Sequence, residues 1–444
     1  MLKSCGSFFE PQVFWNAPFL SGGGYCSEAT SLVSSLEKQG FDVHLQQVSF
    51  PKCLYNLQHG DGVSQGYLSA LSYEDQSMLW RLLNKDRDDR NRITIEVCHS
   101  EPGAWKPAAF DTSDCPQFSK SVSYHVGRTM FETDRLPKGW KKKMNRMDEI
   151  WVPSDFLKSI FEREGVKNVR VVGESVNTHF FRPIVSVRKD ATLPLSQDPE
   201  NTYNLTRAYI FDTVFERHPL HGYASTVFLS IFKWEFRKGW DILLNVYFDS
   251  FSKNDPVSLF IITQEYHSDG DSVDDQVQDF IRTHWAHKAS SLPHFKIVTT
   301  LAPQLFLPYF YNFASAVVLP TRGEGWGRVA QEAMSCGGVV ITTGYGGPLT
   351  FLNANNSFPI PVGRFTTIQE GPFRGHQLVE PDRAELARMM RLVVQNPEEL
   401  NEIRREARES MVRQYSEEAM GKVLEAELLR IESVILGREL EKEL

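Results

Sequence analysis

Pro320–Leu349, PTRGEGWGRVAQEAMSCGGVVITTGYGGPL, carries the strongest fold signal in this chain of 444 residues. It follows the apolar run Ala316–Leu319 and contains a glycine-rich loop, a helical pattern and the β-branched run Val339–Ile341. Buried apolar strands joined by a helix predict a βαβ unit and a parallel sheet. In open parallel sheets, ligands bind at the carboxyl ends of the strands, which is where this loop falls.

The loop itself has the chemistry of a binding site. Gly323, Gly325 and Gly327 let a ligand approach the backbone closely, and the helix N-terminus that follows offers N–H groups to an anion. Glu324 lies in the loop and Glu332 lies eight residues further on, within the helix. Carboxylates accept hydrogen bonds from vicinal hydroxyls, so the two could hold two sugar rings. Either glutamate alone is more simply a solvated charge, but packing does not require the glycine spacing of the whole run.

Two further segments carry weaker signals. In Phe228–Leu244, FLSIFKWEFRKGWDILL, an apolar strand leads into a loop with Lys233, Arg237 and Lys238 before a helix begins. Cations at such a junction suit a diphosphate, although an exposed basic loop is the alternative. Near the start of the chain, a GGG turn precedes the helical pattern Glu28–Gln39.

The 320–349 stretch resembles the E-x7-E segment of retaining glycosyltransferases of family 4, which have the GT-B fold. The resemblance implies that Glu324 is catalytic and contacts the donor sugar, and that Glu332 binds the nucleotide ribose. It places three neighbouring loop residues at the donor: Gly325, Trp326 and Gly327. The departures are Arg328 and Val329, which stand where the family often has an apolar residue and Pro.

The other two segments resemble the same family. Its basic loop has Gly-Arg, four residues and Lys-Gly; here Lys238-Gly239 matches the second half and Lys233 takes the Arg position. The resemblance therefore implies that Lys233 and Lys238, ahead of Arg237, bind the donor diphosphate. The GGG turn is similar to the family's N-terminal glycine-rich loop, which places Gly23 and Gly24 at the donor phosphates.

The acceptor side is less well defined by the sequence. The run Gly127–Pro137, GRTMFETDRLP, is similar to the N-domain of a subgroup of the family, and acceptor contacts usually come from that domain. Glu101, Glu132 and Asp134 are the acceptor candidates. His99 is a catalytic candidate because many relatives have a catalytic His after an N-domain strand; a packed structural histidine is the alternative.

The predicted fold class is α/β: a GT-B protein with two Rossmann-like domains whose parallel sheets face each other across a cleft, and a C-terminal helix crossing back to the N-domain. The strand-helix alternation fails near Val187–Tyr223 and becomes purely helical after Pro381. The expected parts are an acceptor domain at 1–187, a linker or insertion at 188–223, a nucleotide-sugar domain at 224–412 and the returning helix at 413–444.

Composition narrows the partners and the compartment. There are 48 Lys and Arg against 56 Asp and Glu, a net charge of −8, which argues against a broad nucleic-acid-binding surface. No apolar run reaches the ~18–20 residues of a membrane helix, although peripheral membrane contact remains open. The six cysteines form no C-x-x-C pair, so we expect reduced thiols in a cytoplasmic protein.

The predicted reaction is transfer of a hexosyl or mannosyl group from a GDP- or UDP-sugar to an acceptor hydroxyl, with retention of configuration. The acceptor could be a glycan, a lipid or a small molecule. No cofactor and no metal are expected, because both D-x-D strings, Asp86–Asp88 and Asp269–Asp271, lie in polar runs. Two alternatives are a GT-B phosphorylase, which would need a pyridoxal-phosphate lysine, and a catalytically silent sugar-nucleotide-binding subunit.

Overall fold

The structure is a computed structural model that describes residues 11–21, 23–48, 71–86, 93–109, 112, 115–117, 121–184, 225–265, 272–299 and 302–443. The chain divides into two compact units, and each is described by itself. The first unit comprises Met1–Phe131, Arg135–Asn177 and Gln414–Leu444, and the second comprises Glu132–Asp134 and Thr178–Arg413. The predicted linker, 188–223, and both D-x-D strings in whole or in part lie outside the described residues.

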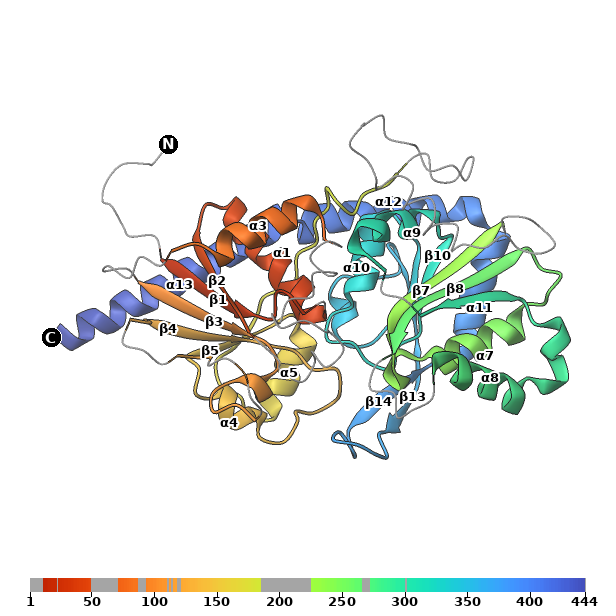
Figure 1. Cartoon of the computed structure of the whole chain (residues 1–444), viewed down its shortest axis with the longest axis horizontal. Helices are drawn as coiled ribbons and strands as arrows, with labels where there is room; N and C mark the ends of the chain where they lie inside the picture. Colours follow the sequence, from red (N-terminus) through yellow and green to blue (C-terminus); the bar gives the residue numbers. More distant parts are fainter. Residues whose placement is uncertain are drawn as a thin grey trace. The chain divides into compact units, whose positions relative to one another are not determined.

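The first unit is built on a six-stranded parallel sheet in the order β2-β1-β3-β4-β5-β6 (Figure 1). Its strands are β1 Gln12–Ala17, β2 Asp42–Gln47, β3 Thr94–His99, β4 Tyr124–Arg128, β5 Glu149–Val152 and β6 Val169–Val171. Its helices are α1 Gly24–Lys38, α3 Tyr73–Leu83, the 3-10 turn η2 Pro102–Ala104, α4 Trp140–Met144, α5 Asp155–Arg163 and α13 Glu417–Glu443. All residues of β1 and β3 are buried, as expected for inner strands of a parallel sheet.

The last helix, α13, belongs to the first unit although it comes at the end of the chain (Figure 1). Its apolar side, including Leu424, Leu428 and Ile431, lies in the same core as Trp15 of β1. Lys38 at the end of α1 also pairs with Glu417, with 2.5 Å between Nζ and Oε2. The predicted return of the C-terminal helix is therefore confirmed, and apolar burial drives it.

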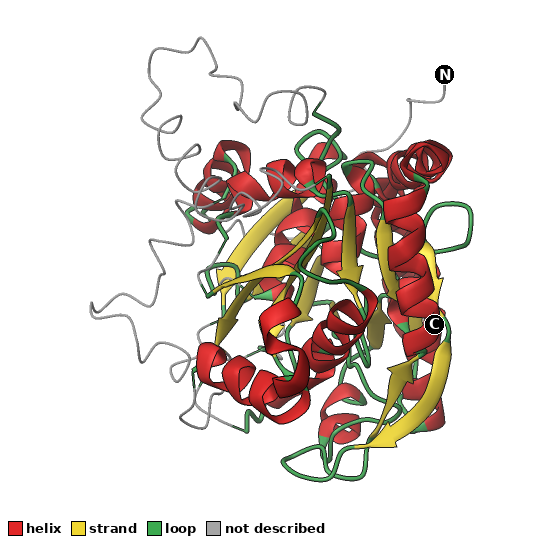
Figure 2. Cartoon of the chain, turned by 90° about the vertical axis from the view of Figure 1, so that its right-hand side faces the viewer, coloured by secondary structure: helices red, strands yellow, loops and turns green. Residues whose placement is uncertain are grey.

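The second unit contains a second six-stranded parallel sheet, in the order β12-β11-β10-β7-β8-β9. Its strands are β7 Thr226–Trp234, β8 Val257–Glu265, β9 His294–Val298, β10 Ala316–Leu319, β11 Val340–Thr343 and β12 Phe358–Ile360. Its α-helices are α7 Trp240–Ser250, α8 Val273–His284, α9 Leu307–Phe313, α10 Arg328–Ser335, α11 Arg383–Gln395 and α12 Leu400–Ser410. Helices cover both faces of this sheet, and the antiparallel hairpin of β13 Val362–Thr367 and β14 Gln377–Pro381 stands apart from it (Figure 2).

The second unit also contains several 3-10 turns, and a π-helical turn precedes α13. The 3-10 turns are η3 Phe236–Lys238, η4 Ala286–Ser291, η5 Gln304–Phe306, η6 Gly347–Thr350 and η7 Pro397–Glu399, and a π-helical turn spans Met411–Tyr415. The two sheets confirm the predicted fold class. The hairpin of β13 and β14 was not predicted, because most side chains of β13 are exposed and show no apolar alternation.

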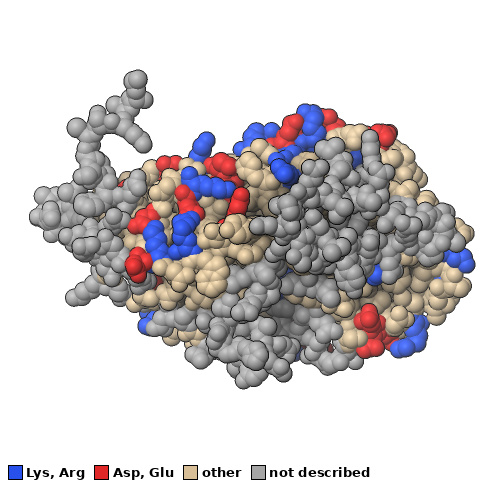
Figure 3. Space-filling model, turned by 45° about the horizontal axis from the view of Figure 1, so that its top comes forward, with Lys and Arg blue, Asp and Glu red and all other residues tan. Residues whose placement is uncertain are grey.

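The surface carries charges of both signs, as the nearly balanced composition predicts. On the face seen in Figure 3, the described Lys and Arg side chains are interspersed with Asp and Glu. Among the described residues, no helix is both long enough and apolar enough to cross a bilayer.

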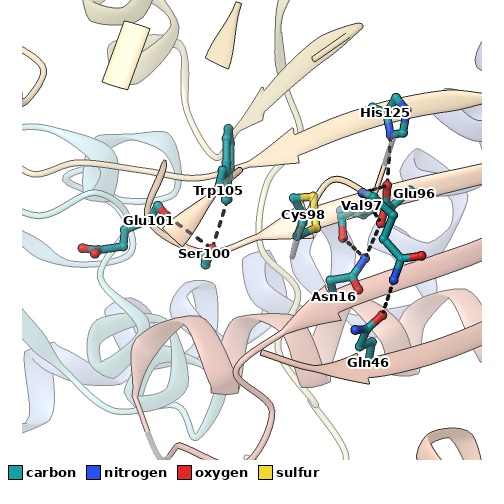
Figure 4. Close-up of a disulfide and its surroundings, with 11 residues drawn as sticks. Asn16, Gln46, Glu96, Val97, Cys98, Ser100, Glu101, Trp105 and His125 are labelled. Atoms are coloured by element: carbon teal, nitrogen blue, oxygen red, sulfur yellow. Dashed lines mark hydrogen bonds and ion pairs between the residues drawn. A yellow bond between two sulfur atoms is a disulfide. The ribbon is translucent and has the colours of Figure 1, made fainter. Parts of the chain in front are cut away.

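The expectation of reduced thiols is wrong for two cysteines. Cys98 at the end of β3 and Cys115 form a disulfide, with their Cα atoms 5.8 Å apart (Figure 4). Cys26 and Cys336 are buried and lie outside any disulfide, and Cys5 and Cys53 fall outside the described residues. Sequence spacing hid the pair, because the chain after β3 turns back and brings Cys115 onto the strand that carries Cys98.

Gly239 is a position at which the fold requires glycine. Its φ is +72°, and a Cβ at this position would lie 2.1 Å from the Pro320 carbonyl oxygen. We expect Gly239→Ala to cost about 2–5 kcal/mol of unfolding free energy, from left-handed strain plus overpacking. Gly40→Ala is the matched control: its φ is +90°, but no described atom lies within 4 Å of the added Cβ. It should cost only about 1–2 kcal/mol, and equal urea midpoints for the two variants would contradict the prediction.

Candidate functional site

Two loops of the second unit meet at the carboxyl ends of adjacent strands. Strands β7 and β10 are parallel neighbours, so the turn after β7 (η3) and the loop after β10 (320–327) come to the same edge of the sheet. The two loops are joined through the backbone, since the Arg322 N–H donates to the Arg237 carbonyl at 2.7 Å. The close approach of Gly239 to Pro320 holds the same junction.

Glu324 lies between two cations at this junction. Its Oε1 is 2.7 Å from Lys238 Nζ, and its Oε2 is 3.4 Å from Arg237 Nη1. All three side chains are 18–19% exposed, so the cluster reaches solvent without being freely solvated. Burial alone would raise the pKa of Glu324, but Lys238 and Arg237 outweigh it and hold that pKa below its ordinary value.

Arg237 is the centre of the cluster, and the sequence ranked it behind the two lysines. Besides Glu324, its guanidinium lies 3.4 Å from Glu132 and 3.3 Å from Glu235. Burial works against the charged form, yet these three carboxylates raise the pKa of Arg237 above its ordinary value. Three carboxylates thus face two cations, and an incoming anion must compete with them.

Arg322, which the sequence analysis did not single out, stabilises the turn that carries the cluster. It is 2% exposed and donates to both carboxylate oxygens of Asp241 at 2.7 Å. It also pairs with Glu380 and donates to the Phe236 carbonyl within η3. A buried Arg that is paired with two carboxylates fixes the turn from which Arg237 and Lys238 project. Its signal in the sequence was only one more charge in a glycine-rich loop.

Glu332 lies apart from these cations, on the helix α10. The Tyr311 hydroxyl donates to Glu332 Oε2 at 2.9 Å, and Arg328 Nε is 3.9 Å from Oε1. Burial raises the pKa of Glu332, against the opposing effects of Arg328 and Tyr311. Arg328, one of the departures from the family pattern, thus neighbours the predicted ribose-binding carboxylate.

The other predicted donor residues of the second unit have varied surroundings. Lys233 lies within β7, opposite Gln264 of β8, and so belongs to the strand instead of the loop. Trp326 is buried, packs against Phe351 and donates from Nε1 to Gln331 Oε1 at 3.1 Å. Its indole is therefore part of the core.

The glycines of the same loop are tightly packed. A Cβ on Gly347 would lie 1.8 Å from the Gly325 carbonyl oxygen, and the Gly347 N–H donates to the Glu324 carbonyl. Gly327, at a φ of +107°, is the N-cap of α10. The backbone shape around Glu324 thus requires glycine.

Two predicted acceptor residues belong to the second unit instead of the first. Glu132 pairs with Arg237, and Asp134 Oδ1 accepts from the Gln377 N–H of β14 at 2.6 Å. The sequence assigned both to the N-domain because they closely follow β4 along the chain. Their carboxylates are engaged within the second unit, which corrects that assignment.

In the first unit, Gly23 is the N-cap of α1 and Gly24 is its first residue. A Cβ added to Gly23 would lie 3.9 Å from the nearest described atom outside its chain neighbours, and a Cβ added to Gly24 would have none within 4 Å. Neither glycine is required by packing, which leaves room for a ligand at this helix N-terminus.

Glu101 follows β3 and is half-buried. Burial raises the pKa of its carboxyl, and Lys143 partly offsets that effect.

His99 is completely buried in the first unit. Its Nδ1 accepts from Trp15 Nε1 at 3.1 Å, and its Nε2 is 3.1 Å from Glu28 Oε2. Glu28 Oε1 is in turn 2.6 Å from Arg128 Nη2. Because both ring nitrogens face protein groups, this geometry suits the structural histidine that the sequence left as the alternative.

The buried Glu28 should make the folded state less stable at low pH. Burial would raise its pKa, but Arg128 and His99 outweigh it and lower that pKa from 4.5 to about 2. A depressed folded-state pKa gives stability that is present above the unfolded pKa and lost as pH falls through the folded one. We therefore expect the urea midpoint to fall between about pH 4.5 and pH 2. Glu28→Gln should flatten part of that fall, and an unchanged slope would contradict the assignment.

Residues 224–410 match the family described as Glycosyl transferases group 1. No curated protein matches the chain. Among solved structures, the chain is similar to HepE from Anabaena in complex with UDP-glucose, with a TM-score of 0.59, 11% identity and coverage of 94% of this chain and 99% of that chain.

Two further solved structures cover nearly the whole chain. Sucrose-phosphate synthase from Thermosynechococcus elongatus has a TM-score of 0.55 and 14% identity, covering 96% of this chain and 100% of that chain. A glycosyltransferase from Rickettsia africae has a TM-score of 0.55 and 15% identity, covering 96% and 99%. At these identities the likeness shows the fold, which is GT-B. The match to the group 1 model is confined to residues 224–410, which lie within the second unit.

Proposed function

We propose that the protein is a glycosyltransferase that moves a sugar from a nucleotide-diphosphate donor to an acceptor hydroxyl with retention of configuration. The observation that carries the proposal is Glu324 held between Arg237 and Lys238 at the ends of β7 and β10, inside the domain that matches group 1 glycosyltransferases. Cations and a carboxylate at one strand edge suit a donor that joins a sugar to a diphosphate.

The donor would rearrange this cluster. A diphosphate carries about two negative charges and competes for Lys238 and Arg237, which releases Glu324 toward the sugar. The cations then stabilise the charge that develops on the leaving diphosphate. Lys233 and the backbone at Gly325, Gly327, Gly23 and Gly24 are further proposed donor contacts.

Glu332 would hold the nucleotide ribose. Tyr311 donates to Oε2 and Arg328 lies 3.9 Å from Oε1, and Oε1 is the oxygen that would accept from a ribose hydroxyl. HepE was solved with UDP-glucose, so UDP-sugars are the first donors to test, with GDP-sugars next. On the acceptor side, Glu101 remains the candidate for a hydroxyl of a glycan, lipid or small molecule.

The test is release of nucleoside diphosphate from a panel of UDP- and GDP-sugars, with and without mixed acceptors. The protein is used in its disulfide form with EDTA present, because we propose that the cations replace a metal. Turnover that survives EDTA, with the donor's anomeric configuration kept in the product by NMR, supports the proposal. Binding without turnover of any donor indicates the silent subunit, and activity restored only by Mn²⁺ or Mg²⁺ contradicts metal independence.

A further inference from the structure

Three side chains with metal-binding atoms, Glu96, Cys98 and Cys115, gather on one face of the first unit's sheet, and His125 lies beside Glu96 (Figure 4). Glu96 and Cys98 are two residues apart on β3 and therefore point to the same face. Their ligand atoms and that of Cys115 all lie within 4.8 Å of one another. His125 of β4 is the register partner of Glu96, and its Nδ1 is 3.0 Å from Glu96 Oε2.

Glu96 is an unusual group for this position, because it is a carboxylate that is only 2% exposed. The Gln117 N–H donates to it at 3.1 Å and Asn16 Nδ2 at 3.3 Å, and both donors are neutral. Among the ion pairs between described residues, its titratable partner is His125. Buried carboxylates are usually paired with a full positive charge or coordinate a metal, so the site suits a cation.

We propose that reduction of the Cys98–Cys115 disulfide creates a Zn²⁺ site, formed by the two thiolates, the Glu96 carboxylate and the His125 imidazole. Two sulfurs, one oxygen and one nitrogen are a donor set that tetrahedral zinc takes readily. A disulfide has no thiolate to offer, so the disulfide and the metal exclude each other. Asn16 and the Gln117 N–H would remain as outer partners that orient Glu96.

The conversion balances with an external dithiol as reductant. The dithiol gives two electrons and two protons: its own disulfide forms, the bond between Cys98 and Cys115 breaks, and two thiols result. Binding of Zn²⁺ then releases the two thiol protons to solvent as the thiolates coordinate it.

Either bond, covalent or metal-mediated, ties Cys115 to β3. The segment between the two cysteines includes Glu101 and Trp105, and Trp105 Nε1 donates to Ser100 Oγ at 3.0 Å (Figure 4). The disulfide would therefore hold this segment in oxidising surroundings, and the Zn²⁺ site would hold it in reducing surroundings. Only reduced protein without metal would release it.

The test uses the full chain, reduced with a phosphine, desalted without oxygen and titrated with Co²⁺ and then Zn²⁺. Reduced wild type should bind one metal per chain with a thiolate-to-Co²⁺ charge-transfer band and the strong visible bands of tetrahedral cobalt. Zn²⁺ should displace the cobalt, and the disulfide form should bind neither ion. Lack of the charge-transfer band in reduced wild type overturns the proposal.

Single variants assign the ligands. Cys98→Ser, Cys115→Ser, Glu96→Gln and His125→Ala should each weaken Zn²⁺ binding at least about 100-fold, more than the loss of an outer partner. Cys26→Ser and Cys336→Ser, which alter buried thiols outside the disulfide, should leave affinity unchanged. Circular dichroism checks that each variant is folded. Wild-type affinity in Cys98→Ser or His125→Ala, or equal losses in Cys26→Ser, overturns the proposed ligand set.

Discussion

Glu324→Gln should lower turnover by about 10²–10³-fold, the range for removing one group aimed at charge in a transition state. Binding of the nucleoside diphosphate should stay the same or tighten. In the structure, Glu324 neutralises Lys238 and Arg237, and a neutral amide would compete with the diphosphate less strongly than the carboxylate does. A large fall in kcat with no loss of product affinity is the signature of an interaction made chiefly in the transition state.

Two comparison variants make this result specific. Glu332→Gln should mainly raise the donor KM, because its carboxylate is proposed to hold the ribose and lies away from the reacting bond. Glu402→Gln alters an exposed helical carboxylate that pairs with Arg405, and it should change neither constant. If Glu324→Gln keeps wild-type turnover, Glu324 has no catalytic role.

The sequence predicted the parts of the fold that local patterns encode. Buried β-branched runs predicted the parallel strands. A local signal of the same kind is a serine at a helix start, such as Ser154, the N-cap of α5, whose hydroxyl accepts from the Leu157 N–H. These features depend on nearby residues and on the periodicity of burial. The disulfide between Cys98 and Cys115 depends on the path of a loop, which no local pattern specifies.

The candidate site was predicted in part for the same reason. The spacing of Glu324 and Glu332 is legible along the chain. The direction of adjacent side chains in a short turn is not, so Arg237 was ranked behind Lys233. Glu132 was assigned to the unit of its sequence neighbours, although three residues there leave that unit and join the other. His99 was a catalytic candidate because it ends a strand; its contacts with Trp15 and Glu28 suit the structural alternative, and no local pattern in the sequence shows those contacts.

Lys238→Ala and Arg237→Ala should each weaken nucleoside-diphosphate binding by about 1.5–3 kcal/mol, the range for a hydrogen bond to a charged group. That loss corresponds to roughly 10–150-fold in dissociation constant. Each of these two variants lacks one of the two cations that face Glu324. The corresponding nucleoside lacks phosphates, so it should bind both variants as it binds wild type.

Lys233 makes this experiment decisive about the departure from the family pattern. If the strand residue Lys233 reaches the diphosphate, Lys233→Ala should lose as much affinity as Lys238→Ala, and Lys233→Arg should keep or improve it, since Arg can form a fork to phosphate oxygens. Lys253→Ala, on an exposed turn of the same unit, is the matched control and should change affinity by less than about 0.5 kcal/mol. Isothermal titration with the diphosphate and its nucleoside separates the outcomes. If a variant loses the same affinity for the diphosphate and for the nucleoside, it is misfolded. If neither Lys238→Ala nor Arg237→Ala loses affinity for the diphosphate, the cluster does not bind it. A loss confined to Lys238→Ala and Arg237→Ala would instead show that η3 alone holds the diphosphate, and it would remove Lys233 from the proposed donor contacts.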